Sequence, residues 1–253
     1  MQTHNQLKNL LLLLFLGLQF NPALADEITI GVSASIPPYI IKETKQGIEL
    51  EILQEAFKIT GHTINIEFLP FARTFTLLDE KKLDGIINTK KGMIDNVFYT
   101  DIAITFQNCV ISLAKNNYPD FKNISFLKNK DIIAFQRASE ILGNEFALIT
   151  KDNDNYEEVA SQRSQVLQFF LERNAEIIII EENIFKYYRN KAYDIIGNKA
   201  HTPVKYHRIF PPTEYRFAFI DEKIRDDFNT GLKTIKSNGT YSQIIDKYER
   251  LML

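Results

Sequence analysis

The sequence predicts an α/β protein with two similar units, each built as a mostly parallel sheet covered by helices. Two observations lead to this fold class. Segments typical of strands and of helices alternate along the chain. The alternation is then interrupted by an extended apolar segment, QNCVISLAKNN at 107–117, and starts again. Two units of about a hundred residues each suit a chain of 253 residues.

The first 25 residues are typical of a secretory signal peptide. Lys8 is their only charge, and an apolar run follows at 10–20. Ala23 and Ala25 then match the small-x-small pattern of a cleavage site. The alternative is a membrane anchor, but the run is shorter than the roughly 20 residues that span a bilayer. We therefore expect a cleaved, exported protein, and the periplasm of a Gram-negative cell fits best.

Composition restricts the partners of the mature chain. The formal net charge of -2 gives no basic surface for nucleic acid or for an anionic membrane. Apolar residues are 45% of the chain, enough for a core of ordinary size. Cys109 is the only cysteine, so no internal disulfide forms, and its apolar surroundings predict a buried, inert thiol. We expect a monomer that needs no cofactor and no metal.

The first unit alternates in the order β-α-β-α-β, which predicts a parallel sheet with crossover helices. Its segments are a strand at 27–33, a helix at 47–60, a strand at 64–69, a helix at 71–82 and a strand at 83–88. Ligands of such sheets bind at the carboxyl ends of the strands. Those ends carry residues 33–39, 70–73 and 88–91.

The second unit repeats the alternation after the extended segment. Its segments are a strand at 131–136, helices at 138–150 and 164–174, a strand at 175–182 and a helix at 182–190, with a polar loop at 151–158. A strand at 214–220 and two helices split at 237–239 then return to the first unit. The predicted lobes are residues 26–107 with 214–253, and residues 108–213. Two crossing strands make a hinge, with a ligand cleft between the lobes.

Seven segments in this order resemble the extracellular solute-binding proteins of family 3, the amino-acid-binding components of ABC importers. They are IPPY at 36–39, GIELEILQEAF at 47–57, LPFARTFTLLDEKKLDGIIN at 69–88, YTD at 99–101, IIAFQRASE at 132–140, AEIIIIEENIFKYY at 175–188 and NGTYSQIIDKY at 238–248. The resemblance implies a two-lobed periplasmic-binding-protein fold (type II, Venus-flytrap) with a two-strand hinge. It also implies closure around a small ligand and delivery to an ABC permease. Delivery to a membrane receptor, as in a sensor, is the alternative.

The resembling proteins hold the ligand carboxylate with an arginine shortly after the third strand. Here Met93 occupies that position, six residues before Tyr99, and a thioether cannot replace a guanidinium. One candidate substitute is Arg73, whose alternatives are a solvated side chain or a partner for Asp84. A second candidate is a loop cation, Lys90 or Lys91, although lysines in loops are usually solvated. The third is Arg137, whose alternative is a position along the surface.

At the other end of the ligand, the resemblance implies an acidic residue that binds an ammonium group. Glu181 matches that position, and we expect it to face the ligand while Glu182 caps the following helix. The alternative is that Glu181 or Glu182 simply caps the helix, a role that is compatible with ligand binding. Near Arg137, Ser139 begins a predicted helix, where free backbone N–H groups would attract an anion.

Four residues of the first unit complete the candidate site. Tyr39 and Phe71 are candidate aromatic walls, with core packing as the alternative; two prolines before Tyr39 favour its exposure. Asn88 and Thr89 end the third strand, where they would bind the ligand or cap a turn.

The sequence contains no arrangement for nucleophilic or metal-dependent catalysis, so we expect a binding protein and not an enzyme. His62 follows a helix end, and His201 and His207 lie in what reads as a polar loop. The surviving alternative is an enzyme that resembles cyclohexadienyl dehydratases, with Glu181 as the proton-transfer acid. For the binding protein, we expect Arg73→Ala and Glu181→Ala to abolish binding with little effect on the unliganded melting temperature.

Overall fold

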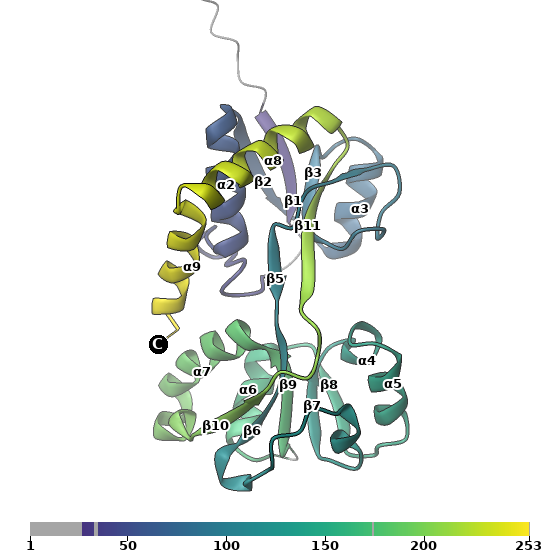
Figure 1. Ribbon diagram of the computed structural model, residues 1–253, viewed down its shortest axis with the longest axis vertical. Helices are drawn as coiled ribbons and strands as arrows, with labels where there is room; N and C mark the ends of the chain where they lie inside the picture. The colour runs from purple at the N-terminus through teal and green to yellow at the C-terminus, as the bar shows by residue number, and fades with distance from the viewer. Residues whose placement is uncertain (1–26, 33–34, 174, 253) are drawn as a thin grey trace, which may run out of the picture.

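The computed structural model describes residues 27–32, 35–173 and 175–252. In this part of the chain the strands form two sheets, each covered by helices, which lie one above the other along the long axis of the molecule (Figure 1). The predicted α/β fold with two units is confirmed. The predicted signal peptide lies outside the described residues. Within them, no helix has both the length and the apolar character needed to cross a bilayer.

The first sheet has the strand order β2 (Thr63–Phe68), β1 (Glu27–Val32), β3 (Gly85–Thr89), β11 (Thr213–Phe219) and β4 (Phe98–Tyr99). β1 is parallel to β2 and β3, whereas β11 is antiparallel to β3 and β4. The helices of this first lobe are α2 (Ile48–Thr60), α3 (Phe71–Asp79), α8 (Glu222–Ser237) and α9 (Thr240–Arg250). α8 packs closely on α2, because Gly231 leaves room where a Cβ would lie 2.0 Å from the Ala56 carbonyl oxygen.

The second sheet has the strand order β10 (Val204–His207), β6 (Asn108–Leu113), β9 (Ile177–Glu181), β7 (Ile132–Phe135) and β8 (Tyr156–Val159). Its second lobe also contains α4 (Ala138–Ile141), α5 (Asn144–Lys151), α6 (Gln162–Phe170) and α7 (Glu182–Ile196), with short 3-10 helices η1 (Ala114–Asn116), η2 (Ile124–Leu127) and η3 (Gly197–His201). Alternate isoleucines of β9 join hydrophobic clusters on opposite faces of the sheet. Burial on both faces explains the uninterrupted apolar run at 177–180.

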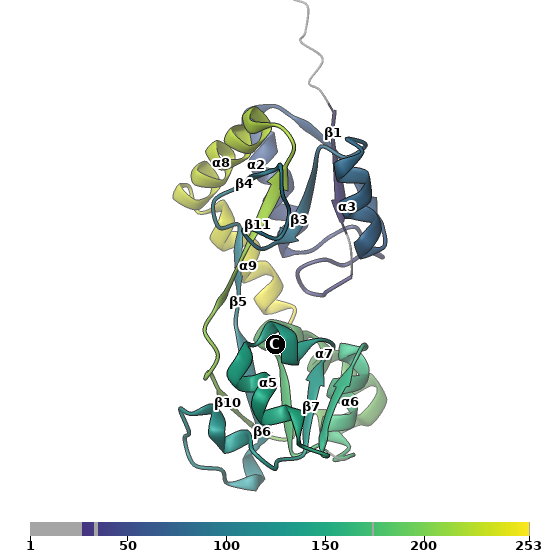
Figure 2. The same ribbon diagram turned by 90° about the vertical axis from the view of Figure 1, so that its right-hand side faces the viewer.

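Two strands connect the lobes. β5 (Ile104–Phe106) runs antiparallel to the start of β11, with Phe106 opposite Thr213 and Ile104 opposite Tyr215. Figures 1 and 2 show this pair crossing from one lobe to the other. The chain passes from the first lobe to the second through β5 and returns through β11.

The structure differs from the sequence prediction at the edges of the second sheet. The predicted polar loop at 151–158 contains the start of β8, and the loop that carries His207 contains β10. Both are edge strands, and their polar composition concealed them. His207 is buried at 4% exposure, so its predicted surface position is wrong. The predicted helix at 138–150 is divided into α4 and α5 at Gly143, where φ is 99°.

A carboxyl group lies unpaired in the core of the first lobe. Glu49, in the first turn of α2, is fully buried, and neither of its oxygens has a hydrogen-bond partner among the described residues. Burial raises the pKa values of Tyr39, Tyr215 and Tyr241, and the Glu49 carboxylate adds to the rise in each. Burial raises the pKa of Glu49 itself to about 8.

We predict that Glu49 makes stability depend on pH. The folded protein holds the Glu49 proton more tightly than the unfolded chain does. Protonated Glu49 therefore contributes fully to the free energy of unfolding below pH 4.5, and this contribution is lost as the pH rises toward about 8. The loss amounts to at most about 1.4 kcal/mol for each pH unit. Urea unfolding of wild type and Glu49→Gln between pH 5 and 8.5 measures it, and the variant should show the smaller slope.

Glu55→Gln is the matched control, since Glu55 lies on the same helix but is partly exposed and paired with Lys58. It should keep the wild-type slope. Equal slopes in wild type and Glu49→Gln would show that Glu49 is not the titrating group.

Candidate functional site

A cavity of about 180 Å³ lies between the two lobes. This is smaller than the roughly 300–1,000 Å³ of pockets for drug-sized ligands, so the cavity suits a small solute. Both lobes and both crossing strands contribute to its wall, at the carboxyl ends of β3, β7 and β9. The lining residues are Ile36, Asn88, Phe106, Asn108, Phe135, Ile141, Gln162, Glu181, Ile184 and Tyr215.

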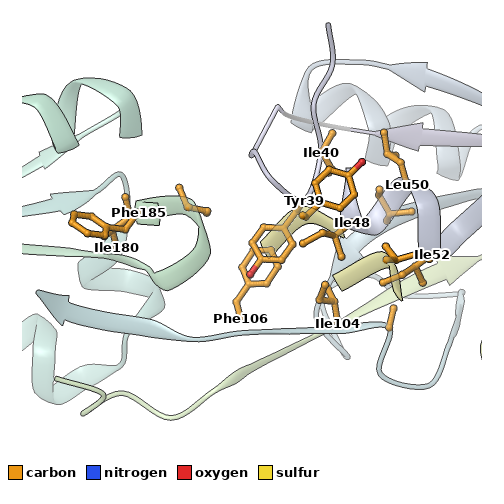
Figure 3. Close-up of a cluster of buried hydrophobic side chains, with 14 of the residues drawn as sticks. Tyr39, Ile40, Ile48, Leu50, Ile52, Ile104, Phe106, Ile180 and Phe185 are labelled. Carbon is orange, nitrogen blue, oxygen red and sulfur yellow. The ribbon is translucent and has the colours of Figure 1, made fainter. Parts of the chain in front are cut away.

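Packed aromatic rings form the hinge side of the cavity. Phe106 of β5 lies 4.6 Å from Tyr215 of β11, measured between ring centroids. Tyr39 stacks on Phe106 at 4.0 Å, between the core of the first sheet and Ile180 and Phe185 of the second lobe (Figure 3).

Tyr39 supports the cavity wall from behind instead of facing solvent. Its side chain is 1% exposed, so the expected exposure is wrong, and core packing is its main role. Its hydroxyl accepts a hydrogen bond of 3.1 Å from the Asn183 side chain, at the start of α7. Tyr39 therefore joins the first lobe to the second.

Glu181 both lines the cavity and caps a helix. One carboxylate oxygen accepts hydrogen bonds from the backbone N–H groups of Asn183, at 2.8 Å, and Ile184, at 2.9 Å. Burial raises the pKa of Glu181 to about 7, although hydrogen bonds from Ile184, Tyr39 and Gln107 oppose the rise. The N-cap of α7 is thus Glu181 and not Glu182, contrary to the expectation.

Glu182 contacts other residues than Glu181 does. It forms ion pairs with Lys186, at 2.9 Å, and Arg208, at 2.8 Å. The Cys109 thiol lies 3.7 Å from it. Cys109 is buried, as predicted, and this burial raises the pKa of its thiol to about 12.

The three candidates at and after the end of β3 lie in different surroundings. Asn88 lines it, with a left-handed φ of 59° at the end of β3. Thr89 is buried and donates to the Arg216 carbonyl at 2.8 Å, so its hydroxyl supports the sheet. Lys90 does not line the cavity, but it is half-buried and its ammonium lies 5.7 Å from the ring centroid of Tyr215, a wall residue. Burial lowers its pKa, and no other described residue forms an ion pair or hydrogen bond with it.

Two other candidates of the first lobe lie outside the cavity wall. Phe71 is 46% exposed and meets Phe75 edge to face at 4.7 Å. The Arg73 side chain is exposed and forms no hydrogen bond or close ion pair with another described residue. Asp84, its suggested partner, instead accepts a 2.7 Å hydrogen bond from the Thr29 backbone.

Arg137 and Ser139 surround a carboxylate of the chain itself. The Arg137 guanidinium is exposed and pairs with Glu140 at 2.7 Å. The backbone N–H groups of Arg137 and Ser139 donate to Glu158 at 2.6 and 2.8 Å. The expectation of free N–H groups at this point is therefore wrong.

Sequence reasoning missed most of the cavity wall. Phe106 and Tyr215 flank the positions where the chain crosses between lobes, and Asn108 is a polar residue at the start of an apolar strand. These features could have identified them. Gln162 follows β8, a strand that the sequence did not predict. Among the described residues, no group of three or more acidic, histidine or cysteine side chains is arranged to hold a metal ion.

Two lobes, two crossing strands and a cavity between the lobes define the periplasmic-binding-protein fold. The chain matches the model of the bacterial extracellular solute-binding proteins, family 3, over residues 28–250, and it belongs to that family. This confirms the resemblance found in the sequence. A search of curated proteins found no match.

Solved structures share this fold at low identity. A histidine kinase sensor domain similar to periplasmic binding proteins has 13% identity and a TM-score of 0.66, covering 88% of this chain and 96% of that chain. A substrate-binding domain of a putative amino acid ABC transporter from Streptococcus pneumoniae has 20% identity and a TM-score of 0.64, covering 88% and 99%. An ancestral amino acid-binding protein, a precursor of cyclohexadienyl dehydratase, has 19% identity and a TM-score of 0.63, covering 88% and 95%.

We predict that Glu181→Ala destabilises the unliganded protein, unlike the expectation from the sequence. Removing the N-cap leaves the N–H groups of Asn183 and Ile184 without an acceptor, which costs about 1 kcal/mol. Urea unfolding measures the loss. Arg73→Ala is the control, since an exposed and unpaired side chain should change stability by less than about 0.5 kcal/mol. An unchanged midpoint for Glu181→Ala would contradict the capping role.

Proposed function

We propose that the chain captures a small polar solute, an amino acid or a related carboxylate or amine, between its two lobes. The observation that carries this proposal is the composition of the interlobe cavity. Both lobes and the hinge contribute to its wall, so a ligand there would contact parts of the protein that move relative to one another. Such a ligand stabilises the closed arrangement by its contacts with both lobes.

The charges in and beside the cavity favour a ligand with a carboxylate at one end and an amine at the other. Lys90 of the first lobe is a half-buried cation without a counter-ion among the described residues, and a ligand carboxylate would supply one. Glu181 of the second lobe offers a buried carboxyl group to an ammonium. In this proposal Lys90, rather than Arg73 or Arg137, takes the place of the absent arginine.

The proposal extends to delivery of the solute to an ABC importer, as family membership suggests. The protein would act as a monomer in the periplasm after removal of residues 1–25. The lobes would comprise residues 26–107 with 214–253, and residues 108–213. The strand composition of the two sheets supports this division, since β1 to β4 and β11 share one sheet and β6 to β10 the other.

Two alternatives each have an observation in their favour. The similar sensor domain favours a role in which the closed protein signals to a receptor. The similar dehydratase precursor, together with a buried Glu181 whose pKa is about 7, favours proton-transfer chemistry in the cavity. A new aromatic absorption band on incubation with a cyclohexadienyl acid would support the enzyme over the binding protein.

We predict that an amino acid or a related monocarboxylate raises the melting temperature of residues 26–253. A ligand at a hundredfold excess over its Kd stabilises the folded state by about 2.7 kcal/mol. A thermal-shift screen would include the twenty amino acids, polyamines, small dicarboxylates and short sugars. Calorimetry would then compare wild type with Lys90→Ala, which should bind the identified carboxylate at least about tenfold more weakly.

Lys91→Ala is the matched control, since Lys91 is the next residue but is exposed. It should bind as wild type does. Equal affinities of wild type and Lys90→Ala would remove Lys90 from the site, while absence of any shift across the panel would contradict the proposed function.

We predict that binding of an amine-bearing ligand weakens in acid. An ammonium pairs with the ionised form of Glu181, whose pKa is about 7. Below that pH the ligand competes with a proton, and affinity should fall by up to about tenfold for each pH unit. Between pH 7 and 8.5 the affinity should be nearly constant. Calorimetry from pH 5 to 8.5 measures the profile.

Glu181→Gln keeps the shape of the side chain and removes its titration. Its profile should be flat and its affinity for the amine lower than that of wild type. Glu49→Gln is the control for the other buried carboxyl group, that of Glu49. This variant should show the same dependence of affinity on pH as wild type. The same acid-dependent loss in Glu181→Gln would assign the titration to another group.

A further inference from the structure

A carboxylate with four hydrogen bonds lies beside the cavity in the second lobe. Glu158 of β8 accepts from the backbone N–H of Arg137 at 2.6 Å, and from the N–H and hydroxyl of Ser139 at 2.8 and 2.7 Å. The Tyr156 hydroxyl donates to it as well, at 2.6 Å. Glu158 thus uses the acceptor capacity of a carboxylate almost fully.

The pairing of β7 with β8 brings Glu158 to the edge of the cavity. The two strands are parallel, and Glu158 lies opposite Ala134. The loop that donates to Glu158 runs between Phe135 and Ile141, which both line the cavity. Gln162, another wall residue, lies four positions after Glu158 in the chain. The Glu158 carboxylate is therefore held just behind the second-lobe wall.

No residue in the described part of the chain forms an ion pair with this carboxylate. Its donors are neutral N–H and O–H groups, and the hydrogen bonds from Tyr156, Ser139 and Arg137 hold its pKa below the usual value against the effect of burial. The nearby Arg137 guanidinium is paired with Glu140 instead. The negative charge of Glu158 thus remains beside this part of the wall, and it occupies the N–H groups of Arg137 and Ser139.

We propose that Glu158 determines specificity by acting as a resident anion that excludes ligands with a second acidic group on the second-lobe side. This inference rests on the proposed function and narrows it. The ligand class would be monocarboxylates whose side chain is neutral or cationic. A dicarboxylate would meet a like charge, and the N–H groups of Arg137 and Ser139 would already be occupied.

The test uses pairs of ligands that have nearly the same shape and differ in charge. Calorimetry would compare L-glutamine with L-glutamate, and L-asparagine with L-aspartate, on wild type, Glu158→Ala and Glu157→Ala. Glu157 is the matched control, because it is the next residue of β8 but is exposed. Wild type and Glu157→Ala should bind the acidic member of each pair more weakly than the amide.

In Glu158→Ala the ratio of acid affinity to amide affinity should rise at least about tenfold. A purely structural role of Glu158 would weaken both members equally and leave this ratio unchanged. If Glu158→Ala does not fold, Glu158→Gln supplies the comparison, since it keeps the size of the side chain and removes the charge.

The outcomes separate this inference from the proposed function. Equal binding of acid and amide by wild type, or an unchanged ratio in the Glu158 variant, would overturn the inference while the proposed function stands. A gain of acid binding in Glu158→Ala supports the inference even if wild type binds neither member. If neither wild type nor any variant binds a ligand, in this comparison or in the thermal-shift screen, both the inference and the proposed function are overturned.

Discussion

The antiparallel pair formed by β5 and β11 is the constraint on which the cavity depends. These strands connect the lobes, and they also carry Phe106 and Tyr215, the aromatic side of the cavity. Tyr39 stacks on Phe106 from the first lobe, and Asn183 reaches the Tyr39 hydroxyl from the second. A change in the angle between the lobes therefore changes the packing of the cavity wall, and a ligand in contact with these rings acts directly on the hinge.

The periodicity of apolar residues was enough to predict the elements that are buried on one or two faces. It located α2 almost to the residue, and it identified β9 from four consecutive isoleucines. It failed for β8 and β10, because an edge strand has a partner on one side only and tolerates polar residues. Gly143 was visible in the sequence, but its positive φ, which divides α4 from α5, was not.

The site was harder to predict because its side chains meet through register and not through sequence spacing. Glu181 and Glu182 are adjacent, yet one caps α7 beside the cavity and the other pairs with Arg208. Ser139 was expected to present free donors, but β7 pairs with β8 in a register that delivers Glu158 to them. Lys90 differs from Lys91 only in its burial beside Tyr215. Such differences appear only once the strands are assembled.

The place of β11 in the first sheet has a consequence for the order in which the lobes are completed. β11 lies between β3 and β4, although it follows the entire second lobe in the chain. During synthesis or translocation from the N-terminus, one edge of β3 therefore stays unpaired until β11 emerges. By then the strands at 108–207 already have all their partners. The lobe that begins the chain is the last to finish its sheet, and a chaperone that protects nascent segments would be needed most at the exposed edge of β3.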